Sequence, residues 1–456
     1  MNDLLNTTRR IHLVGMGGAG MSGLARILLQ RGHVVTGSDL RESRPLDALR
    51  VLGAGIVLGH RAENVADAEI VVISSAVPRD NPEVLEARAR DLVVLRRAEM
   101  LAALMEGHRG AVIAGTHGKT TTTSMTVVAL QAAGGDPSFA IGGSLNESGT
   151  NAHGGRDDIF VAEADESDRS FLVFRPHFAV VTNVEHDHPE EFVDEAEVAS
   201  AFRDFLDRRA VEAPALLCID DPGAARLAEH LDPPVMTYGT DPHADLRLLP
   251  GDDGTHRLRR DGEVVASFEL AVPGRHNALN ATAALGVCAW AGVDLQAAAS
   301  GLARFTGATR RFQRLGTVAG VEVVDDYAHH PTELRATLAA ARTLDVDRIV
   351  LVVQPHRYSR TQSLGAELGR AASAADVVLV TDVYASGEPP VPGVTGQLVA
   401  DAAADAGAKV HYHPHLADVV DGLVDLVRPG DLVLTTGAGD VTQLGSKLLS
   451  RLEGER

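Results

Sequence analysis

The stretch with the clearest chemical meaning is residues 115–123, which read Gly-Thr-His-Gly-Lys-Thr-Thr-Thr-Thr. Glycines let backbone N–H groups close around phosphate oxygens, Lys119 can reach the outer phosphates, and the Thr120 hydroxyl can hold Mg²⁺. The spacing departs from the standard P-loop, because Gly115 lies three residues before Gly118 instead of five. A turn with a solvent-facing lysine is the alternative, but an apolar run before the turn and a helical segment after it favour nucleotide binding.

A second glycine motif lies near the N-terminus. Gly15, Gly17 and Gly20 fit the pattern G-x-G-x-x-G, and Asp39 follows about twenty positions later. Such glycines let the backbone approach a pyrophosphate, and Asp39 could accept hydrogen bonds from ribose hydroxyls. The motif alone does not separate NAD, FAD and a nucleotide sugar, and a tight turn without a ligand remains an alternative.

Acidic residues and a histidine follow two later apolar runs, 159–163 and 178–183. The carboxyl ends of parallel strands form the ligand crevice of an α/β sheet, so we expect these side chains near phosphates held by Lys119. Hard oxygen ligands with a histidine suit Mg²⁺, although a solvated acidic loop is the alternative. The set is Glu163, Asp165, Glu166, Asp168, Asn183, Glu185, Asp187 and His188.

Two further pairs of polar residues follow the same logic. Asn277 and Asn280 share one face at the start of an alanine-rich helix and could contact an adenine edge, but helix capping explains them equally well. Arg357 and Arg360 follow a buried strand and suit the clamping of a carboxylate or phosphate.

These residues need elements to position them, and the apolar pattern supplies such elements. The run 111–114 predicts a strand before the Lys119 loop and a helix over 124–133 after it. The run 11–14 predicts a strand before the first glycine motif and a helix over 24–31. Strands and helices alternate along most of the chain, which predicts an α/β fold, while runs between 215 and 268 predict antiparallel hairpins at a sheet edge.

At roughly 150 residues per domain, 456 residues predict three domains. We place an N-terminal Rossmann-like domain at 1–106, a central P-loop ATPase-like α/β domain with an antiparallel edge at 107–309, and a C-terminal Rossmann-like domain at 310–456. The formal net charge of −20 argues against a nucleic-acid partner.

The cysteine and hydropathy patterns bear on the compartment. Cys218 and Cys288 lie in apolar contexts without a CxxC partner, which indicates buried thiols in a reducing compartment. No apolar run approaches the ~18 residues that span a bilayer, and the polar N-terminus has no signal core. We therefore expect a soluble cytoplasmic protein.

Together these motifs resemble those of the Mur ligases, ATP-dependent enzymes that form amide bonds in peptidoglycan synthesis. The resemblance covers nearly the whole chain. It differs in one place, where His186 and Pro189 stand at positions at which other residues are expected. Besides the two glycine motifs, it rests on the segments 163–168 (EADESD), 275–280 (RHNALN), 325–333 (DDYAHHPTE), 354–361 (QPHRYSRT) and 437–440 (GAGD).

The resemblance implies a ligase that joins L-alanine to the lactyl carboxylate of UDP-N-acetylmuramate through an acyl phosphate, with release of ADP and phosphate. Its partners would be these small molecules, ATP and Mg²⁺, without nucleic acid or membrane, and it would be a monomer or homodimer. Alternatives are a related ligase that adds another amino acid or a recycled peptide, an NAD-dependent oxidoreductase built on the first motif, and a P-loop sensor that binds ATP without turnover.

The resemblance also implies roles for individual residues. The UDP-sugar would be held by Gly15, Gly17, Gly18, Ala19, Gly20, Met21, Ser22, Asp39, His60, Ser74 and His356. ATP would be held by Gly115, Thr116, His117, Gly118, Lys119, Thr120, Thr121, His276, Asn277, Asn280, Arg311 and Asp326. The metal ligands would be Thr120, Glu163 and His188, and the catalytic residues would be Lys119, His329, Arg357 and Arg360.

Overall fold

The structure is a computed structural model that describes residues 4–146, 148–251 and 254–454. Its strands form three sheets, and the chain divides into two compact units that are described separately. The first unit comprises Met1–Val184, Ala199–Glu269 and Asn280–Phe305. The second comprises Glu185–Val198, Leu270–Leu279 and Thr306–Arg456.

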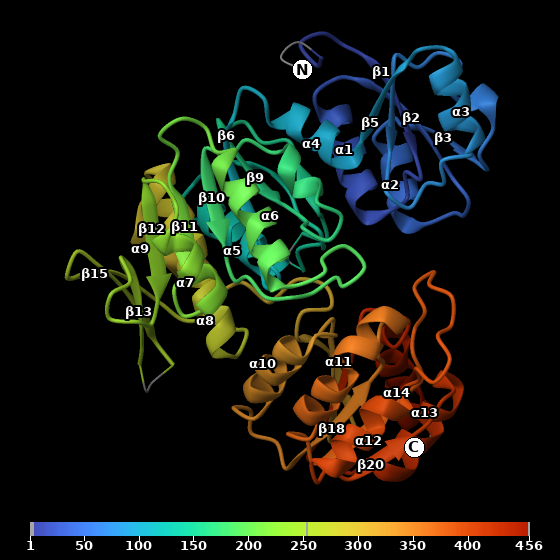
Figure 1. The fold of residues 1–456 in the computed structure, drawn as a ribbon, viewed down its shortest axis with the longest axis vertical. Helices are drawn as coiled ribbons and strands as arrows, with labels where there is room; N and C mark the ends of the chain where they lie inside the picture. Colours follow the sequence, from blue (N-terminus) through green and yellow to red (C-terminus); the bar gives the residue numbers. More distant parts are fainter. Residues whose placement is uncertain (1–3, 147, 252–253, 455–456) are drawn as a thin grey trace. The chain divides into compact units, whose positions relative to one another are not determined.

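The first glycine motif belongs to a five-stranded parallel sheet of order β3-β2-β1-β4-β5. Val14 and Val71 in its central strands are fully buried, because helices such as α2 and α3 flank the sheet (Figure 1). The elements are β1 Arg10–Val14, α1 Ala19–Gln30, β2 Val34–Asp39, α2 Arg44–Val51, β3 Gly55–Leu58, η1 Ala62–Val65, β4 Ile70–Ile73, α3 Pro82–Ala89, β5 Val93–Arg96 and α4 Arg97–Met105.

The second glycine motif belongs to a ten-stranded sheet of order β15-β14-β13-β12-β11-β10-β6-β9-β7-β8. Strands β13, β14 and β15 pair antiparallel at one edge, which confirms the predicted hairpins. The strands are β6 Arg109–Ala114, β7 Ser138–Ala140, β8 Ala152–His153, β9 Ile159–Glu163, β10 Phe178–Val181, β11 Ala215–Cys218, β12 Val235–Gly239, β13 Leu246–Pro250, β14 His256–Arg260 and β15 Glu263–Phe268. The helices of this region are α5 Lys119–Ala132, η2 Ser170–Val173, α6 Glu195–Asp207, α7 Pro222–Glu229, α8 Arg275–Ala291 and α9 Leu295–Leu302.

Helices α1 and α5 begin earlier than the apolar pattern predicted. Helix α1 begins at Ala19 instead of residue 24, and α5 begins at Lys119 instead of residue 124. Each starts directly after a glycine at the N-cap, and apart from Met21 its first turn consists of small or polar residues, so it carries no apolar period. The consequence is functional, because the free N–H groups of both first turns lie within the glycine motifs.

The third sheet has the order β16-β17-β21-β18-β19-β20, and only β16 pairs antiparallel. Two apolar clusters, one containing Leu334 and Leu351 and the other Val350 and Leu444, cover its two faces. Figure 1 labels its surrounding helices. The elements are β16 Gln313–Val318, β17 Val321–Asp326, α10 Pro331–Ala341, β18 Arg348–Val353, α11 Tyr358–Ala372, β19 Val377–Val380, α12 Gln397–Asp405, β20 Val410–Tyr412, α13 Leu416–Leu426, β21 Asp431–Thr436 and α14 Thr442–Gly454.

The α/β class and the buried cysteines agree with the sequence predictions. Cys218 and Cys288 are both buried, and burial raises the pKa of each thiol to about 12. Among the described residues, no helix combines the length and apolar character needed to cross a membrane. The domain boundaries at 106 and 309 stay predictions.

Candidate active site

The first glycine motif forms a tight loop between β1 and α1. The N–H groups of Gly15 and Met16 both donate to the Ser38 carbonyl, at 2.9 Å each. The Gly17 N–H donates to Asp39 Oδ2 at 2.8 Å, and a Cβ at Gly17 would lie 2.9 Å from that oxygen, so glycine permits this close approach. Asp39, predicted near a ribose, therefore braces the loop at the carboxyl edge of the sheet.

Other residues predicted to hold the UDP-sugar lie in or beside this loop. A Cβ at Gly15 would be 3.9 Å from Ser74 Oγ, so the two strand ends meet. Met21 and Ser22 are buried, and the Ser22 hydroxyl donates to the Ala19 carbonyl at 3.0 Å. Their side chains are thus directed into the protein. The Ser22 N–H donates to the Gly18 carbonyl at 2.8 Å, so only the backbone N–H of Met21, in the first turn, is on offer to a phosphate.

Sequence reasoning missed a buried carboxylate beneath this edge, that of Glu83 in the first turn of α3. Ser38 Oγ donates to it at 2.6 Å, His60 Nδ1 lies at 3.0 Å, the Asn64 amide also donates, and His12 Nε2 lies at 3.7 Å. Burial opposes the charge, but the nearby His12 and hydrogen bonds from Ser38 and Asn64 prevail and lower the pKa of Glu83 to about 2.

This network fixes the ring of His60, one of the predicted UDP-sugar residues. A carboxylate only accepts hydrogen bonds, so the hydrogen of His60 lies on Nδ1, facing Glu83. The only signal for Glu83 in the sequence is an acidic residue after Asn81-Pro82, and the helix dipole ordinarily explains such a residue.

The second glycine motif encloses the ammonium group of Lys119. Lys119 Nζ donates to the carbonyls of Gly115 at 2.7 Å and Thr116 at 3.1 Å, and it lies 2.7 Å from Glu166 Oε2. Burial disfavours the charged ammonium, but Glu166 and Asp165 outweigh burial and raise the pKa of Lys119. The lysine is therefore cationic at neutral pH and held at the mouth of its own loop.

Neighbouring strand ends support the same loop. The N–H groups of Thr116 and His117 donate to Asn183, at 3.1 Å to its carbonyl and 2.7 Å to its side-chain oxygen. A Cβ at Gly118 would lie 2.8 Å from Asn280 Oδ1, so the amide predicted to contact adenine lies against the phosphate loop.

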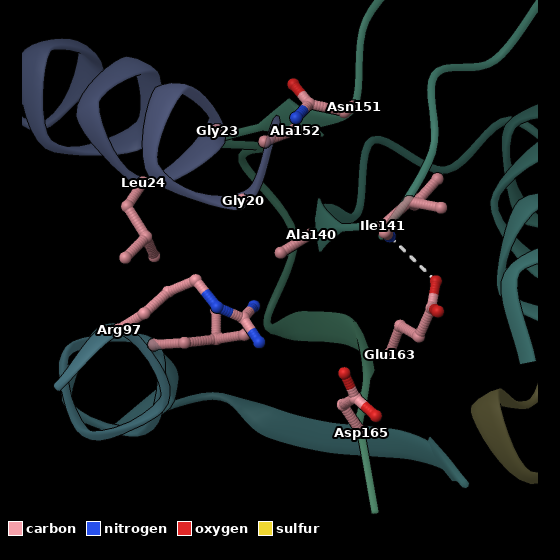
Figure 2. Close-up of a pocket in the computed structure, with 12 residues that line it drawn as sticks. Gly20, Gly23, Leu24, Arg97, Ala140, Ile141, Asn151, Ala152, Glu163 and Asp165 are labelled. Carbon is pink, nitrogen blue, oxygen red and sulfur yellow. Dashed lines mark hydrogen bonds between the residues drawn. The ribbon is translucent and has the colours of Figure 1, made fainter. Parts of the chain in front are cut away.

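Thr120 and Glu163, two of the predicted metal ligands, are in contact. Thr120 Oγ1 donates to Glu163 Oε1 at 2.9 Å, and the Gly142 N–H donates to Glu163 Oε2 at 2.7 Å. Figure 2 shows the carboxylates of Glu163 and Asp165 on one wall of a cavity. A hydroxyl and carboxylates at a strand end form the hard oxygen donor set that suits Mg²⁺.

The second unit pairs the predicted arginines with carboxylates far away in sequence. Arg360 Nε donates to Asp187 Oδ1 at 2.8 Å, and both side chains are buried. Arg357 has φ +67° and its guanidinium pairs with Glu190, which lies 3.4 Å from Nδ1 of the predicted metal ligand His188. The helix start at Arg357 and the segment 185–190 are thereby held together.

Two histidines lie beside these arginines. The rings of His329 and His356 are 5.8 Å apart, and His356 Nδ1 lies 3.2 Å from an Arg360 nitrogen. Burial lowers the pKa of His329 to about 4 and that of His356 to about 3, so both are neutral at pH 7. His329 Nδ1 lies 2.9 Å from the Tyr327 carbonyl and must donate to it, which leaves Nε2 as an acceptor.

Asp326, predicted near a ribose, is buried and accepts backbone hydrogen bonds from Phe312 at 2.7 Å and Ala328 at 2.8 Å. Burial raises its pKa to about 6. The Arg311 guanidinium lies 4.9 Å from the Tyr327 ring centre. Asp326 thus shapes the turn that presents Arg311.

The other predicted nucleoside residues lie at the start of α8. The Asn277 amide donates to the Pro273 carbonyl at 2.7 Å, which ties this side chain to the segment before α8. Burial lowers the pKa of His276 to about 4.

The predicted residues therefore form two groups. The first unit gathers the two glycine motifs, the metal-ligand candidates Thr120 and Glu163, and Asn280. The second unit gathers His188, His329, His356 and the arginines.

Comparison with known proteins identifies the family. Three family models match in succession: "Mur ligase family, catalytic domain" over residues 10–109, "Mur ligase middle domain" over 113–288, and "Mur ligase, glutamate ligase domain" over 310–439. The UDP-N-acetylmuramate–L-alanine ligase of Acidothermus cellulolyticus is 50% identical over 452 residues, covering 97% of this chain and 95% of the relative. That of Mycolicibacterium smegmatis is 49% identical over 462 residues, with the same coverage of both chains.

A solved structure agrees with these sequence matches. The UDP-N-acetylmuramate-alanine ligase of Thermotoga maritima superposes with a TM-score of 0.80 at 28% identity, covering 98% of this chain and all of that one. The predicted resemblance and the three-domain α/β fold are thus confirmed. The chain belongs to the Mur ligase family.

Proposed function

We propose that this protein is an ATP-dependent ligase that joins L-alanine to the lactyl carboxylate of UDP-N-acetylmuramate in peptidoglycan synthesis. The observation that carries this function is near-50% identity, over almost the whole of both chains, to ligases named for that reaction. The oxidoreductase alternative is set aside, because it leaves the Lys119 loop without a role.

The phosphate loop supports activation of the carboxylate by ATP. A carboxylate that attacks the γ-phosphate brings two anions together, so cationic groups must neutralise the developing charge. Lys119 is largely buried, charged and held within its loop, which suits this role at little reorganisation cost. Attack forms a carboxyl oxygen–phosphorus bond and releases ADP.

The second step is attack of the alanine amine on the acyl phosphate. A carbon–nitrogen bond forms, the amine loses a proton, and the tetrahedral intermediate expels inorganic phosphate. His329 is a candidate acceptor for that proton, because its neutral ring leaves Nε2 unprotonated. Its lowered pKa makes it a weak base, so it suits a proton passed from an already developing tetrahedral ammonium better than one taken from free alaninium.

Magnesium fits the residues at the phosphate loop. Thr120 and Glu163 present oxygen donors 2.9 Å apart, and we assign His188 as a third ligand on the strength of the family resemblance. When bound, the ion would neutralise phosphate charge.

We assign binding of the sugar nucleotide to the loop at Gly15–Gly20. The expected compartment is the cytoplasm, where ATP is abundant.

The test is an amino-acid panel in an assay of ADP release with UDP-N-acetylmuramate. We expect L-alanine to support the highest kcat/KM, ahead of glycine and L-serine, and a muropeptide tripeptide to give no turnover. Turnover with the tripeptide, or with glycine above alanine, would contradict the assignment. Lys119→Met serves as the control, since it retains much of the side-chain volume without the charge.

A further inference from the structure

One cavity of the first unit has an arginine on its wall that the proposed function does not yet use. The cavity lies between the first turns of α1, the start of α4, and the strand ends that bear Glu163 and Asp165. Figure 2 shows Arg97 reaching from α4 into the space between Gly20 and the two carboxylates.

The guanidinium of Arg97 has no hydrogen-bond or ion-pair partner among the described residues. It is half-buried, and although Glu163 and Asp165 line the same cavity, neither forms an ion pair with it. Two other arginines of this unit are engaged: Arg9 pairs with Glu69, and Arg50 pairs with Glu42. A half-buried guanidinium without a counter-ion lacks the bidentate partner that its geometry suits.

The position of Arg97 depends on the first glycine motif. A Cβ at Gly20 would lie 2.7 Å from Arg97 Cδ and 3.2 Å from Nη1, so the arginine lies directly against the first turn of α1. The glycine at position 20 thus makes room for the arginine. The cationic group is therefore adjacent to the backbone N–H groups that the motif offers to a phosphate.

We propose that Arg97 binds the diphosphate of the UDP-sugar, on the opposite side of the anion from the glycine loop. This inference rests on the proposed function and adds a binding residue to it. The diphosphate would lie between the loop and the guanidinium, with two of its oxygens accepting parallel N–H hydrogen bonds. The lactyl carboxylate, the other anion of the same substrate, is the competing source of such contacts.

The experiment measures the affinities of UDP, UDP-N-acetylglucosamine and UDP-N-acetylmuramate by calorimetry, for the wild-type chain, Arg97→Ala and Arg97→Lys. Arg88→Ala is the matched control, because Arg88 is exposed on α3 of the same domain. We expect Arg97→Ala to weaken all three ligands by about 10- to 100-fold, as for loss of a charged hydrogen bond, and Arg97→Lys to weaken them less. KM for the UDP-sugar should rise, while KM for ATP stays unchanged.

The three ligands separate the possible outcomes. UDP and UDP-N-acetylglucosamine lack the lactyl group, so a loss confined to UDP-N-acetylmuramate would assign Arg97 to the carboxylate and overturn the proposal. Unchanged affinity for all three ligands in both Arg97 variants, with unchanged thermal stability, would also overturn it. Failure of the wild-type chain to bind UDP would contradict the proposed function itself.

Discussion

Replacing Glu166 by Gln tests the central geometry of the phosphate loop. Glu166 is the carboxylate that faces the ammonium of Lys119, at 2.7 and 3.0 Å, and the two side chains are only 2% and 14% exposed. Such a pair belongs to the buried class, in which loss of one partner leaves a charge uncompensated. Glu166→Gln keeps the shape of the side chain and removes only its charge.

The cost of breaking a buried ion pair is about 3–5 kcal/mol in the free energy of unfolding, against about 0–1 kcal/mol for an exposed pair. Lys119 keeps some exposure and two carbonyl acceptors, at Gly115 and Thr116, so we expect about 3 kcal/mol for Glu166→Gln. In the double variant Lys119→Met/Glu166→Gln neither charge remains, and most of that loss should be recovered.

The assay is urea denaturation of the wild-type chain, both single variants and the double variant, with and without Mg-ATP. ATP phosphates can replace Glu166 as the counter-ion of Lys119, so ATP should stabilise Glu166→Gln more than the wild type. Glu229→Gln, on the exposed end of α7, is the control and should be neutral. Equal stability of Glu166→Gln and the wild type would refute the buried pair, and an equal ATP effect would refute the exchange of counter-ions.

Three further predictions follow from the same geometry. Thr120→Val keeps the shape of the side chain and removes the hydroxyl that donates to Glu163. The Mg²⁺ concentration needed for half-maximal activity should therefore rise, while the free energy of unfolding changes little. If that Mg²⁺ concentration is unchanged, Thr120 is not a metal ligand. The lowering of the Glu83 pKa from 4.5 to about 2 stabilises the fold by at most about 3 kcal/mol above pH 4.5, and this stabilisation is lost as the pH falls towards 2. The difference in unfolding free energy between the wild type and Glu83→Gln should therefore shrink between pH 4.5 and 2. A difference that stays constant would contradict the lowered pKa. Burial lowers the pKa of His329 to about 4, so between pH 6.5 and 4 this histidine is protonated in the unfolded chain but neutral in the folded chain. The free energy of unfolding should therefore decrease as the pH is lowered from 6.5 to 4, and His329→Gln should make this decrease less steep.

Much of the site could be predicted because chemistry in α/β sheets is confined to strand ends. Glu163 and Ser74 are polar residues that end or directly follow an apolar run, Lys119 lies in the glycine turn after such a run, and all three lie at carboxyl ends of strands in their sheets. The helix starts at residues 19 and 119 were not predictable from apolar periodicity, because the residues that bind phosphate occupy the first turn.

The contacts that could not be predicted join residues far apart in sequence. Arg360 and Asp187 are separated by 173 positions, and nothing in the local pattern of either residue selects the other. The sequence pattern does not single out Arg97, because the absence of a counter-ion near it among the described residues exists only in three dimensions. Glu83 was missed for the opposite reason, because a buried acid satisfied by four partners resembles an ordinary first-turn glutamate in sequence.

The cations predicted for catalysis share one feature in the structure. Lys119 pairs with Glu166, Arg360 with Asp187, and each pair lies within its own compact unit. A substrate anion must therefore replace or join an existing carboxylate, so the net binding energy of each contact is a difference between two ion pairs and is smaller than either. The carboxylates keep the cations in place before substrate arrives, at some expense in affinity. Among the residues that the structure describes, Arg97 has no such partner, so an anionic ligand that binds it displaces water and no carboxylate. By this reasoning the UDP-sugar end of the substrate should contribute most of its ground-state affinity, while the paired cations act chiefly when charge develops on the transferring phosphate.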